Sequence, residues 1–259
     1  MPIEGPDVLL YEKKGHLVTI TMNRPERLNA MSDELVEKLV ETWERFRDDD
    51  DAWVAILTGA GERAFCAGRD LKERVEKGRR KLKYPFERTC PTGCQGLWKP
   101  VIAAVNGVAV AGGWYLAQNC DIRVASENAT FGISEVKWNL GANWAVTLPR
   151  YVPLGLAMEI VLTGEQISAK RAYEIGFVNR VVPNDQLMAE AEKIADTILQ
   201  CGPKSVWAHK ELLWRGLSLS HDEGLAMSTH IVAPLYEMED SKEGPRAFVE
   251  KRKPQWELK

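Results

Sequence analysis

Cysteine is scarce in this chain, and the few that occur form no regular pattern. The 259 residues contain five cysteines, an odd number at irregular spacings. Disulfide frameworks belong mainly to short secreted chains, so we expect free thiols in a reducing compartment. Cys90 and Cys94 lie close together, but no second pair or histidine cluster follows to supply the roughly four ligands that zinc needs. The sequence therefore predicts no metal site.

Basic clusters and uninterrupted hydrophobic runs are also missing. The net charge is −3, and acidic and basic residues are mixed along the chain, which argues against a nucleic-acid-binding surface. The first residues show no basic region followed by an apolar run, so no signal peptide is expected. Residues 100–120 carry no charge, but Asn, Gln and Gly interrupt them, which favours a buried strand, turn and helix over a membrane span. We therefore expect a soluble, cytoplasmic protein that binds neither nucleic acid nor membrane.

The apolar residues that are present suffice for a large core. Hydrophobic residues make up 45% of the chain and charged residues 27%, as in ordinary globular proteins. Strand and helix patterns alternate to about residue 183 and only helices are expected afterwards, which indicates an α/β fold with an α-helical C-terminal region. Strands are expected at residues 8–22 (a hairpin), 53–57, 64–66, 101–105, 121–125 and 177–182. Helices are expected from residue 32 to the acidic run at 48–51, then at 70–83 (with a mobile loop), 114–119, 168–176, 185–199, 202–216, 221–236 and 243–253.

Two turns of small residues stand out at strand–helix junctions. Residues 67–70 (Ala-Gly-Arg-Asp) and 110–113 (Val-Ala-Gly-Gly) each follow an apolar strand and open a helix. The first backbone N–H groups of a helix have no intrahelical partner and favour negative charge beyond them. Two such turns side by side would form an oxyanion hole. Glycine turns at these junctions also occur for structural reasons alone, so the spacing leaves both interpretations open.

Five segments, in order, resemble those of the crotonase (enoyl-CoA hydratase/isomerase) superfamily and together span about residues 8–256. They read NRPERLNAM, AFCAGRDLKE, KPVIAAVNGVAVAGGWYLAQNCDIRVASENATFGISEVKW, MEIVLTGEQISAKRAYEIGFVNRVV and EGPRAFVEKRKPQW. The resemblance implies a spiral of β-β-α units in residues 1–195, with the CoA and active sites, and a helical C-terminal trimerisation region in residues 196–259. It also implies an acyl-CoA thioester substrate, a homotrimer or dimer of trimers, and no cofactor beyond the CoA of the substrate.

The resemblance assigns three catalytic roles. The oxyanion donors would be the backbone N–H groups of Arg69 and Gly112, and Glu135 would be the acid/base. The residues alone favour a different interpretation, in which Glu135 is a surface carboxylate paired with Lys137. Its mostly apolar neighbours would raise its pKa toward the range of a working acid/base, and its position matches the second catalytic glutamate of the family.

Tyr115 departs from the family pattern. Standard hydratases read GGG-x-E at this turn, and the glutamate there helps to hold the attacking water. A phenol with a pKa of about 10 cannot be the same base, although it can donate a hydrogen bond. The pattern of one glutamate resembles enoyl-CoA isomerases and hydroxycinnamoyl-CoA hydratase-lyases. A tyrosine that orients the phenolic substrate of the latter falls at Arg74 here, which argues against a phenolic substrate.

Two sets of substrate contacts are expected: an acyl pocket, from residues after Glu135 that depart from the family pattern, and a CoA site, which the resemblance implies. Tyr115 together with Trp138, Asn143 and Trp144 would line an acyl pocket suited to an aromatic, cyclic or branched group, unless the two tryptophans are ordinary core. CoA would contact the loop after the first hairpin, the turn at residues 67–70, and the last helix. The residues implied are Arg27, Leu28, Ala30, Ala67, Asp70, Leu71, Phe248 and Lys251, of which the last two come from a neighbouring subunit in some relatives.

These assignments rank the possible functions. Hydration or dehydration of a bulky, cyclic or aryl enoyl-CoA, which is a lyase activity, comes first. Double-bond isomerisation by Glu135 alone and hydratase-lyase cleavage are the alternatives within the family. A CoA-thioester-binding protein without catalysis is the alternative from another class.

Overall fold

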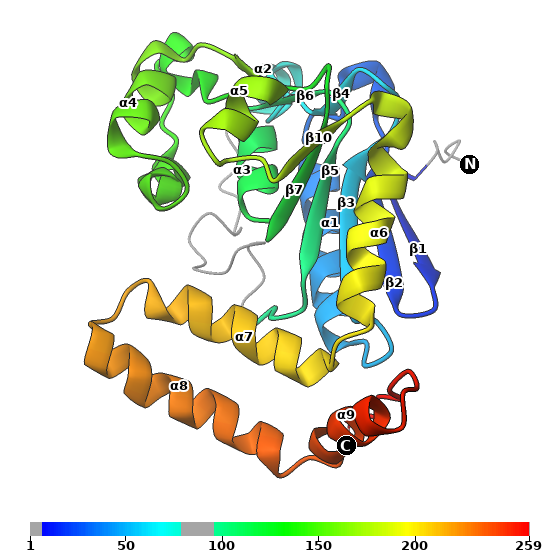
Figure 1. Ribbon diagram of the computed structural model, residues 1–259. Helices are drawn as coiled ribbons and strands as arrows, with labels where there is room; N and C mark the ends of the chain where they lie inside the picture. Colours follow the sequence, from blue (N-terminus) through cyan, green and yellow to red (C-terminus); the bar gives the residue numbers. More distant parts are fainter. Residues whose placement is uncertain (1–6, 79–95, 259) are drawn as a thin grey trace.

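The computed structural model describes residues 7–78 and 96–258 (Figure 1). Cys90 and Cys94 lie outside these residues, and so do residues 79–83 of the helix and mobile loop expected at residues 70–83. The described chain forms two sheets, a set of helices around them, and three C-terminal helices below. No helix among the described residues is long and apolar enough to cross a membrane. The uncharged residues 100–120 instead form two strands and a buried helix.

The larger sheet has six strands in the order β1-β2-β3-β5-β7-β10. Its first two strands form the expected antiparallel hairpin, and the others run parallel to β2. Every residue of β3 and β5 is buried, as expected of parallel strands that are covered on both faces. The strands are β1 Leu9–Lys14, β2 Leu17–Met22, β3 Val54–Gly59, β5 Val101–Val105, β7 Ile122–Ser126 and β10 Arg180–Val182.

Two helices cover the faces of this sheet. Helix α1 (Asp33–Asp48) begins at Ser32, whose side chain accepts the Leu35 N–H, as the sequence predicts. Its apolar face joins the larger hydrophobic cluster, whereas α6 (Leu187–Leu199) packs on the opposite face of β3, β5 and β7. The boundary expected after residue 195 thus falls inside α6, and the helical C-terminal region begins after this helix ends.

The smaller sheet has four short strands in the order β4-β6-β8-β9. The first three are parallel, and each follows a long strand of the larger sheet along the chain. This produces three successive β-β-helix units: β3-β4-α2, β5-β6-α3 and β7-β8-η2. The elements are β4 Ala64–Cys66, α2 Leu71–Lys77, β6 Val108–Val110, α3 Gly112–Gln118, β8 Thr130–Gly132, the 3-10 helix η2 Ser134–Trp138 and β9 Ile167–Ser168. The spiral of β-β-α units is therefore confirmed.

Three sequence expectations were wrong in detail. No strand was expected within residues 106–120 or 126–176, but β6 and β8 form there. The strand expected from Phe177 starts only at Arg180, because the Phe177 and Val178 N–H groups both donate to the Ala172 carbonyl at the end of α5. The last helix begins and ends earlier than expected. The remaining short elements are η1 Pro25–Arg27, the 3-10 helix η3 Asn143–Arg150, α4 Leu154–Thr163, α5 Ala169–Glu174, η4 Asn184–Gln186 and α9 Asp240–Val249.

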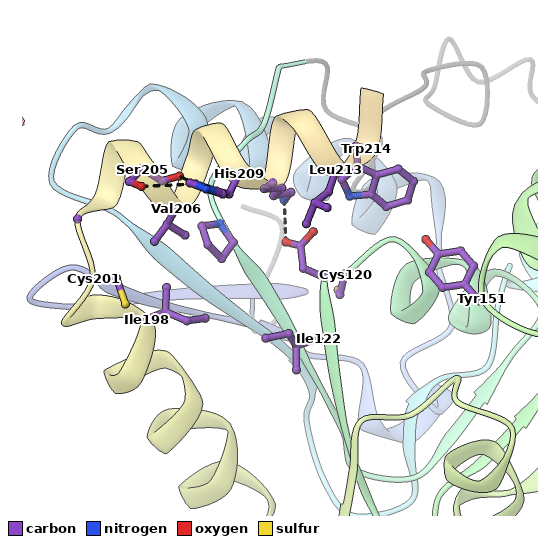
Figure 2. Close-up of a pocket in the computed structure, with 14 residues that line it drawn as sticks. Cys120, Ile122, Tyr151, Ile198, Cys201, Ser205, Val206, His209, Leu213 and Trp214 are labelled. Carbon is purple, nitrogen blue, oxygen red and sulfur yellow. Dashed lines mark hydrogen bonds and ion pairs between the residues drawn. The ribbon is translucent and has the colours of Figure 1, made fainter. Parts of the chain in front are cut away.

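The C-terminal region is attached through α7 (Pro203–Gly216). Lys210 of this helix is buried and forms a 2.7 Å ion pair with Asp121, next to the start of β7. The same amino group donates to the Lys99 carbonyl at 2.8 Å. Beside this anchor, an apolar cavity of about 570 Å³ separates α7 from the beginnings of β5 and β7 (Figure 2). Helix α8 (His221–Tyr236) packs on α7 and buries none of its own residues.

Gly113 is required where α3 meets β4. A Cβ atom at this position would lie 1.9 Å from the Cys66 carbonyl oxygen, which belongs to rigid backbone. We expect Gly113→Ala to lower the free energy of unfolding by about 3 kcal/mol or more, because the helix must move away from the strand. Chemical denaturation monitored by circular dichroism measures this.

Gly155 provides the matched control for Gly113→Ala. It also lies in a helix, α4, but a Cβ atom there would meet nothing within 4 Å. Gly155→Ala should leave stability unchanged or raise it by up to about 1 kcal/mol. Equal denaturation midpoints for the two variants would contradict the close approach of α3 to β4.

Candidate active site

The candidate site lies where β4, β6 and β8 end. Strands β4 and β6 pair in parallel with Cys66 opposite Ala109, and β6 and β8 pair in parallel with Val110 opposite Gly132. Parallel strands end at the same edge of a sheet, so the residues that follow them are neighbours. Arg69 follows β4 and lies just before α2, Gly112 begins α3 after β6, and Glu135 lies in η2 after β8. The pairing therefore brings the three predicted catalytic groups to one edge.

The two predicted oxyanion donors lie close together. The Met31 N–H donates to the Gly68 carbonyl at 2.7 Å and the Asp70 N–H to the Met31 carbonyl at 3.0 Å, so the intervening Arg69 N–H points away from Met31. A Cβ atom on Gly112 would lie 3.8 Å from the Arg69 nitrogen. Neither the Arg69 nor the Gly112 N–H donates a hydrogen bond to another described residue. Both N–H groups can therefore donate to a ligand, that of Arg69 just before α2 and that of Gly112 at the start of α3.

Close backbone contacts hold this arrangement. A Cβ atom on Gly68 would lie 3.1 Å from the Gly112 nitrogen, and the φ of Gly68 is 86°. Ala111, just before α3, has φ 52° and ψ −122°, a backbone conformation that costs a residue with a Cβ about 1–3 kcal/mol. Its N–H donates to the Gly132 carbonyl at 2.8 Å. The strained residue thereby ties the start of α3 to the end of β8, three residues before Glu135.

Glu135 carries a half-buried carboxylate that forms no ion pair with the residues that the structure describes. Its Oε2 atom is buried and makes no hydrogen bond to any described residue. Burial raises the pKa of this carboxyl, and the hydrogen bond from its own backbone N–H only partly offsets the rise. Lys137, the alternative partner suggested by the sequence, pairs instead with Glu165 at 2.7 Å. A carboxyl with this environment is suited to accept and return a proton.

Tyr115 follows Gly112 by one helical turn, and its side chain is buried. Its ring lies against Trp144 of η3, with the ring centroids 5.6 Å apart at an interplanar angle of 51°. Trp144 is buried within the larger hydrophobic cluster, so it is at once a core residue and a neighbour of the site. The structure thus places an aromatic pair beside the predicted oxyanion donors.

The other two residues predicted for the acyl pocket lie differently. The Trp138 side chain is 65% exposed at the end of η2. Asn143 is exposed at the start of η3, and its Oδ1 accepts the Trp144 N–H at 3.0 Å. Asn143 therefore orients Trp144, and of the three predicted residues Trp144 is the one in contact with Tyr115.

Two of the three predicted CoA-binding segments are joined. The Ala67 N–H donates to the Leu28 carbonyl at 3.0 Å, which fixes the loop after β2 to the turn after β4. Exposed Arg27 and half-buried Ala30 belong to the same loop. Leu71, 43% exposed, begins α2 at the other side of the turn. These residues form one continuous surface beside the oxyanion donors.

Asp70 has structural partners in this surface. Its carboxylate pairs with Arg24 at 3.0 Å and caps α2 by accepting the Glu73 N–H. Burial alone would raise the pKa of Asp70, but these two hydrogen bonds hold the pKa below its usual value. Arg24 also donates to the Ala30 carbonyl, so it connects both loops. The sequence interpretation missed Arg24, although it lies within the segment that carries the resemblance.

Asn29 was also missed. It is fully buried with φ 53°, a conformation that asparagine tolerates better than most residues. Its amide donates to the carbonyls of Ala60 and Ala64, and its Oδ1 accepts the Arg24 N–H. Asn29 therefore holds the loop against both sheets.

The third predicted CoA segment lies elsewhere in the chain. Phe248 is 85% exposed near the end of α9, and Lys251 is exposed just after it. Helix α9 lies at the opposite end of the molecule from α2 (Figure 1). Within one chain, these two residues do not meet the other predicted CoA contacts.

Metal and thiol chemistry find no support in the described part of the chain. It contains no group of three or more His, Cys, Asp or Glu side chains able to hold a metal ion. Burial raises the pKa of the Cys66 and Cys120 thiols to about 12, so neither is a thiolate near neutral pH.

Comparison with known proteins agrees with this geometry. The family model for enoyl-CoA hydratase/isomerase matches residues 12–259. An enoyl-CoA hydratase of Mycobacterium tuberculosis is 41% identical over 98% of this chain and 97% of its own. An (E)-benzylidenesuccinyl-CoA hydratase of Thauera aromatica is 40% identical over 94% of this chain and 96% of its own.

A solved structure shows the same fold. The crystal structure of an enoyl-CoA hydratase from Bacillus anthracis has a TM-score of 0.91 and 36% identity to this chain, covering 97% of it and 100% of the solved chain. The repeated β-β-helix units and the similarity over nearly the whole length point to the same family. The chain belongs to the enoyl-CoA hydratase/isomerase family of the crotonase superfamily.

Proposed function

We propose that this enzyme adds water to, or removes it from, an enoyl-CoA with a bulky, cyclic or aryl acyl group. The observation that carries the proposal is the half-buried Glu135 carboxylate, whose buried Oε2 atom has no hydrogen-bond partner among the described residues. Glu135 follows β8, which pairs with the strand that leads to the Gly112 amide. Enolate stabilisation and proton transfer are the two requirements of this reaction, and these groups meet them.

The reaction begins with the thioester oxygen between the Arg69 and Gly112 N–H groups. Glu135 takes a proton from water as the water oxygen bonds to the β-carbon, and the electron pair of the double bond moves to the thioester oxygen as an enolate. Each amide donor stabilises this charge by about 3–4 kcal/mol. Glu135 then returns the same proton to the α-carbon and the carbonyl re-forms. Dehydration is the reverse sequence.

Tyr115 assists by donating a hydrogen bond to the water. Its phenol can donate, but it cannot replace the second carboxylate as a base. The proposal of a bulky acyl group is supported by the aromatic pair of Tyr115 and Trp144, which an acyl group of this kind could contact. It is also supported by the Thauera relative, whose name states an aryl substrate. Isomerisation needs the same amides and the same single carboxyl, so the mass of the product decides between the two reactions.

Removing the Glu135 carboxylate should abolish most of the turnover. In Glu135→Gln we expect kcat for hydration to fall by about 100-fold or more, because the amide cannot accept and return the proton. Mass spectrometry of straight-chain, cyclic and aryl enoyl-CoA thioesters, before and after incubation, measures the gain of water.

Glu165→Gln is the matched control, since Glu165 is an exposed carboxylate that pairs with Lys137. It should keep the wild-type rate. Double-bond migration without a mass change would establish isomerisation instead. Release of acetyl-CoA would establish the hydratase-lyase reaction. Full turnover by Glu135→Gln would refute the assigned role, and no turnover of any thioester by wild type would favour a binding protein.

The same substitution should change stability in a pH-dependent way. Folding raises the pKa of Glu135 above its ordinary value of 4.5, so the buried carboxylate disfavours the folded state once it is ionised. Glu135→Gln should therefore unfold at a higher temperature than wild type at pH 7. The difference should shrink as the pH falls through the raised pKa toward 4.5, where wild type becomes protonated. Calorimetry across this range checks the sign, and a difference independent of pH would contradict it.

We also propose that the enzyme acts as a homotrimer or a dimer of trimers, and in the cytoplasm. The support is the apolar surface of α7, α8 and the turn between them, where α8 buries none of its residues. The exposed residues are Leu213, Leu217, Leu219, Leu225 and Tyr236. A neighbouring subunit would cover them and bring Phe248 and Lys251 to a CoA site.

Light scattering should give three or six times the mass of one chain, and a monomer at micromolar concentration would contradict this.

A further inference from the structure

A chain of hydrogen bonds joins α3 to η3 one turn beyond the predicted oxyanion donors. The Trp114 indole N–H donates to Gln118 Oε1 at 3.0 Å, and the Gln118 amide donates to Thr147 Oγ1 at 2.7 Å. The Thr147 hydroxyl in turn donates to the Trp144 carbonyl at 3.0 Å. Trp114 and Gln118 are both fully buried. We call Gln118 and Thr147 the α3–η3 bridge.

The direction of every bond in this chain follows from the indole. An indole N–H can only donate, so it fixes the carbonyl side of the Gln118 amide and turns the amino side toward Thr147. The Thr147 oxygen accepts that hydrogen bond and has one proton left for the Trp144 carbonyl. The indole itself is held by stacking on Phe177, with centroids 4.4 Å apart, and by edge contact with Phe131. The packed Trp114 ring therefore fixes the orientation of the Gln118 amide, and through it the orientation of the Thr147 hydroxyl.

The bridge holds the backbone of Trp144. Helix η3 is a 3-10 helix of eight residues, whereas such helices rarely exceed about four, and Pro149 inside it has no N–H to donate. Its own hydrogen bonds are therefore a weak support for Trp144. Asn143 holds the Trp144 N–H, and Thr147 holds its carbonyl. The indole of Trp144 then lies against Tyr115.

We propose that Gln118 and Thr147 are positioning residues that fix Trp144 against Tyr115 and thereby set which acyl groups the site accepts. This rests on the proposed function, in which the acyl group extends past Tyr115 from a thioester held by Gly112. Hydrogen bonds are directional, so the bridge fixes the angle of the Trp144 ring as well as its distance. Without the bridge, the ring can shift into the space of a bulky acyl group.

The test compares kcat/KM for cinnamoyl-CoA, an aryl thioester, with kcat/KM for crotonyl-CoA, a straight-chain one. In Thr147→Val, which keeps the shape but removes the hydroxyl, the aryl-to-straight-chain ratio should fall by about fivefold or more. Gln118→Met, which removes the amide, should lower the ratio in the same direction. Thr147→Ser keeps the hydroxyl and should stay within about twofold of wild type. An unchanged ratio in both bridge-breaking variants would overturn the proposal.

Thr58 offers a matched control for the loss of a hydroxyl. Its Oγ1 donates to the Ala104 carbonyl at 2.9 Å within the larger sheet, and it is buried. Thr58→Val should lower the thermal stability but leave the substrate ratio unchanged. If Thr58→Val changed the ratio as much as Thr147→Val, the effect would be one of general destabilisation and the positioning role would be wrong.

A double-mutant cycle shows whether the bridge acts through Trp144. In a Trp144→Leu background, Thr147→Val should change the ratio less than about twofold, because the ring that the bridge positions is gone. Additive effects would overturn the proposal. Absence of turnover of both thioesters by wild type would refute the proposed function as well, whereas turnover with unchanged ratios would refute the positioning role alone.

Discussion

Backbone pairing of β4, β6 and β8 is the interaction on which the candidate site depends. Each strand has three residues, and each ends in a tight transition to a helix. Their parallel register brings together groups that are widely separated in sequence, from Arg69 to Glu135. Short strands contribute few hydrogen bonds of their own. Polar side chains from outside the sheet therefore help to hold it. The Asn106 amide, for example, donates to the Ala64 carbonyl of β4 at 3.3 Å and to the Gly59 carbonyl of β3 at 2.8 Å, and so ties the two sheets together.

The same constraint explains where the chain is strained. A helix that starts directly after β6 requires the unusual backbone of Ala111 and the absence of a side chain at Gly113. In return, the first N–H groups of α3 face the edge of the sheet instead of bonding within the helix. Partial burial of Glu135 is a similar local cost, since it disfavours the ionised carboxylate. Ala111 and Gly113 flank Gly112, and Glu135 is the predicted acid/base, so both features lie at or next to residues to which the resemblance assigns catalysis, as expected when strain is retained for function.

The sequence predicted the long elements and the fold class, because the apolar periods of β3, β5, α1 and α6 extend over enough residues to be recognised. It did not predict β6 and β8, since three residues are too few to show an alternation. No particular strand or helix was predicted for residues 126–167, because 3-10 helices such as η3 have no strong pattern. The pairing of Lys137 with Glu165 could not be foreseen either, as it depends on how α4 returns the chain to η2. The catalytic assignments came from the resemblance, and the geometry of Arg69 and Gly112 is compatible with them.

The ion pair between Lys210 and Asp121 has a consequence for the order in which the molecule is built. Asp121 precedes β7, whereas Lys210 lies on α7, so the carboxylate is synthesised long before its partner. Asp121 also accepts the Val101 N–H, which places it at the edge of the sheet as soon as β5 and β7 pair. A nascent chain that has reached only α6 thus carries a core in which Asp121 still lacks its ion-pair partner. Docking of α7 supplies that partner, so the C-terminal helices complete the core rather than merely follow it.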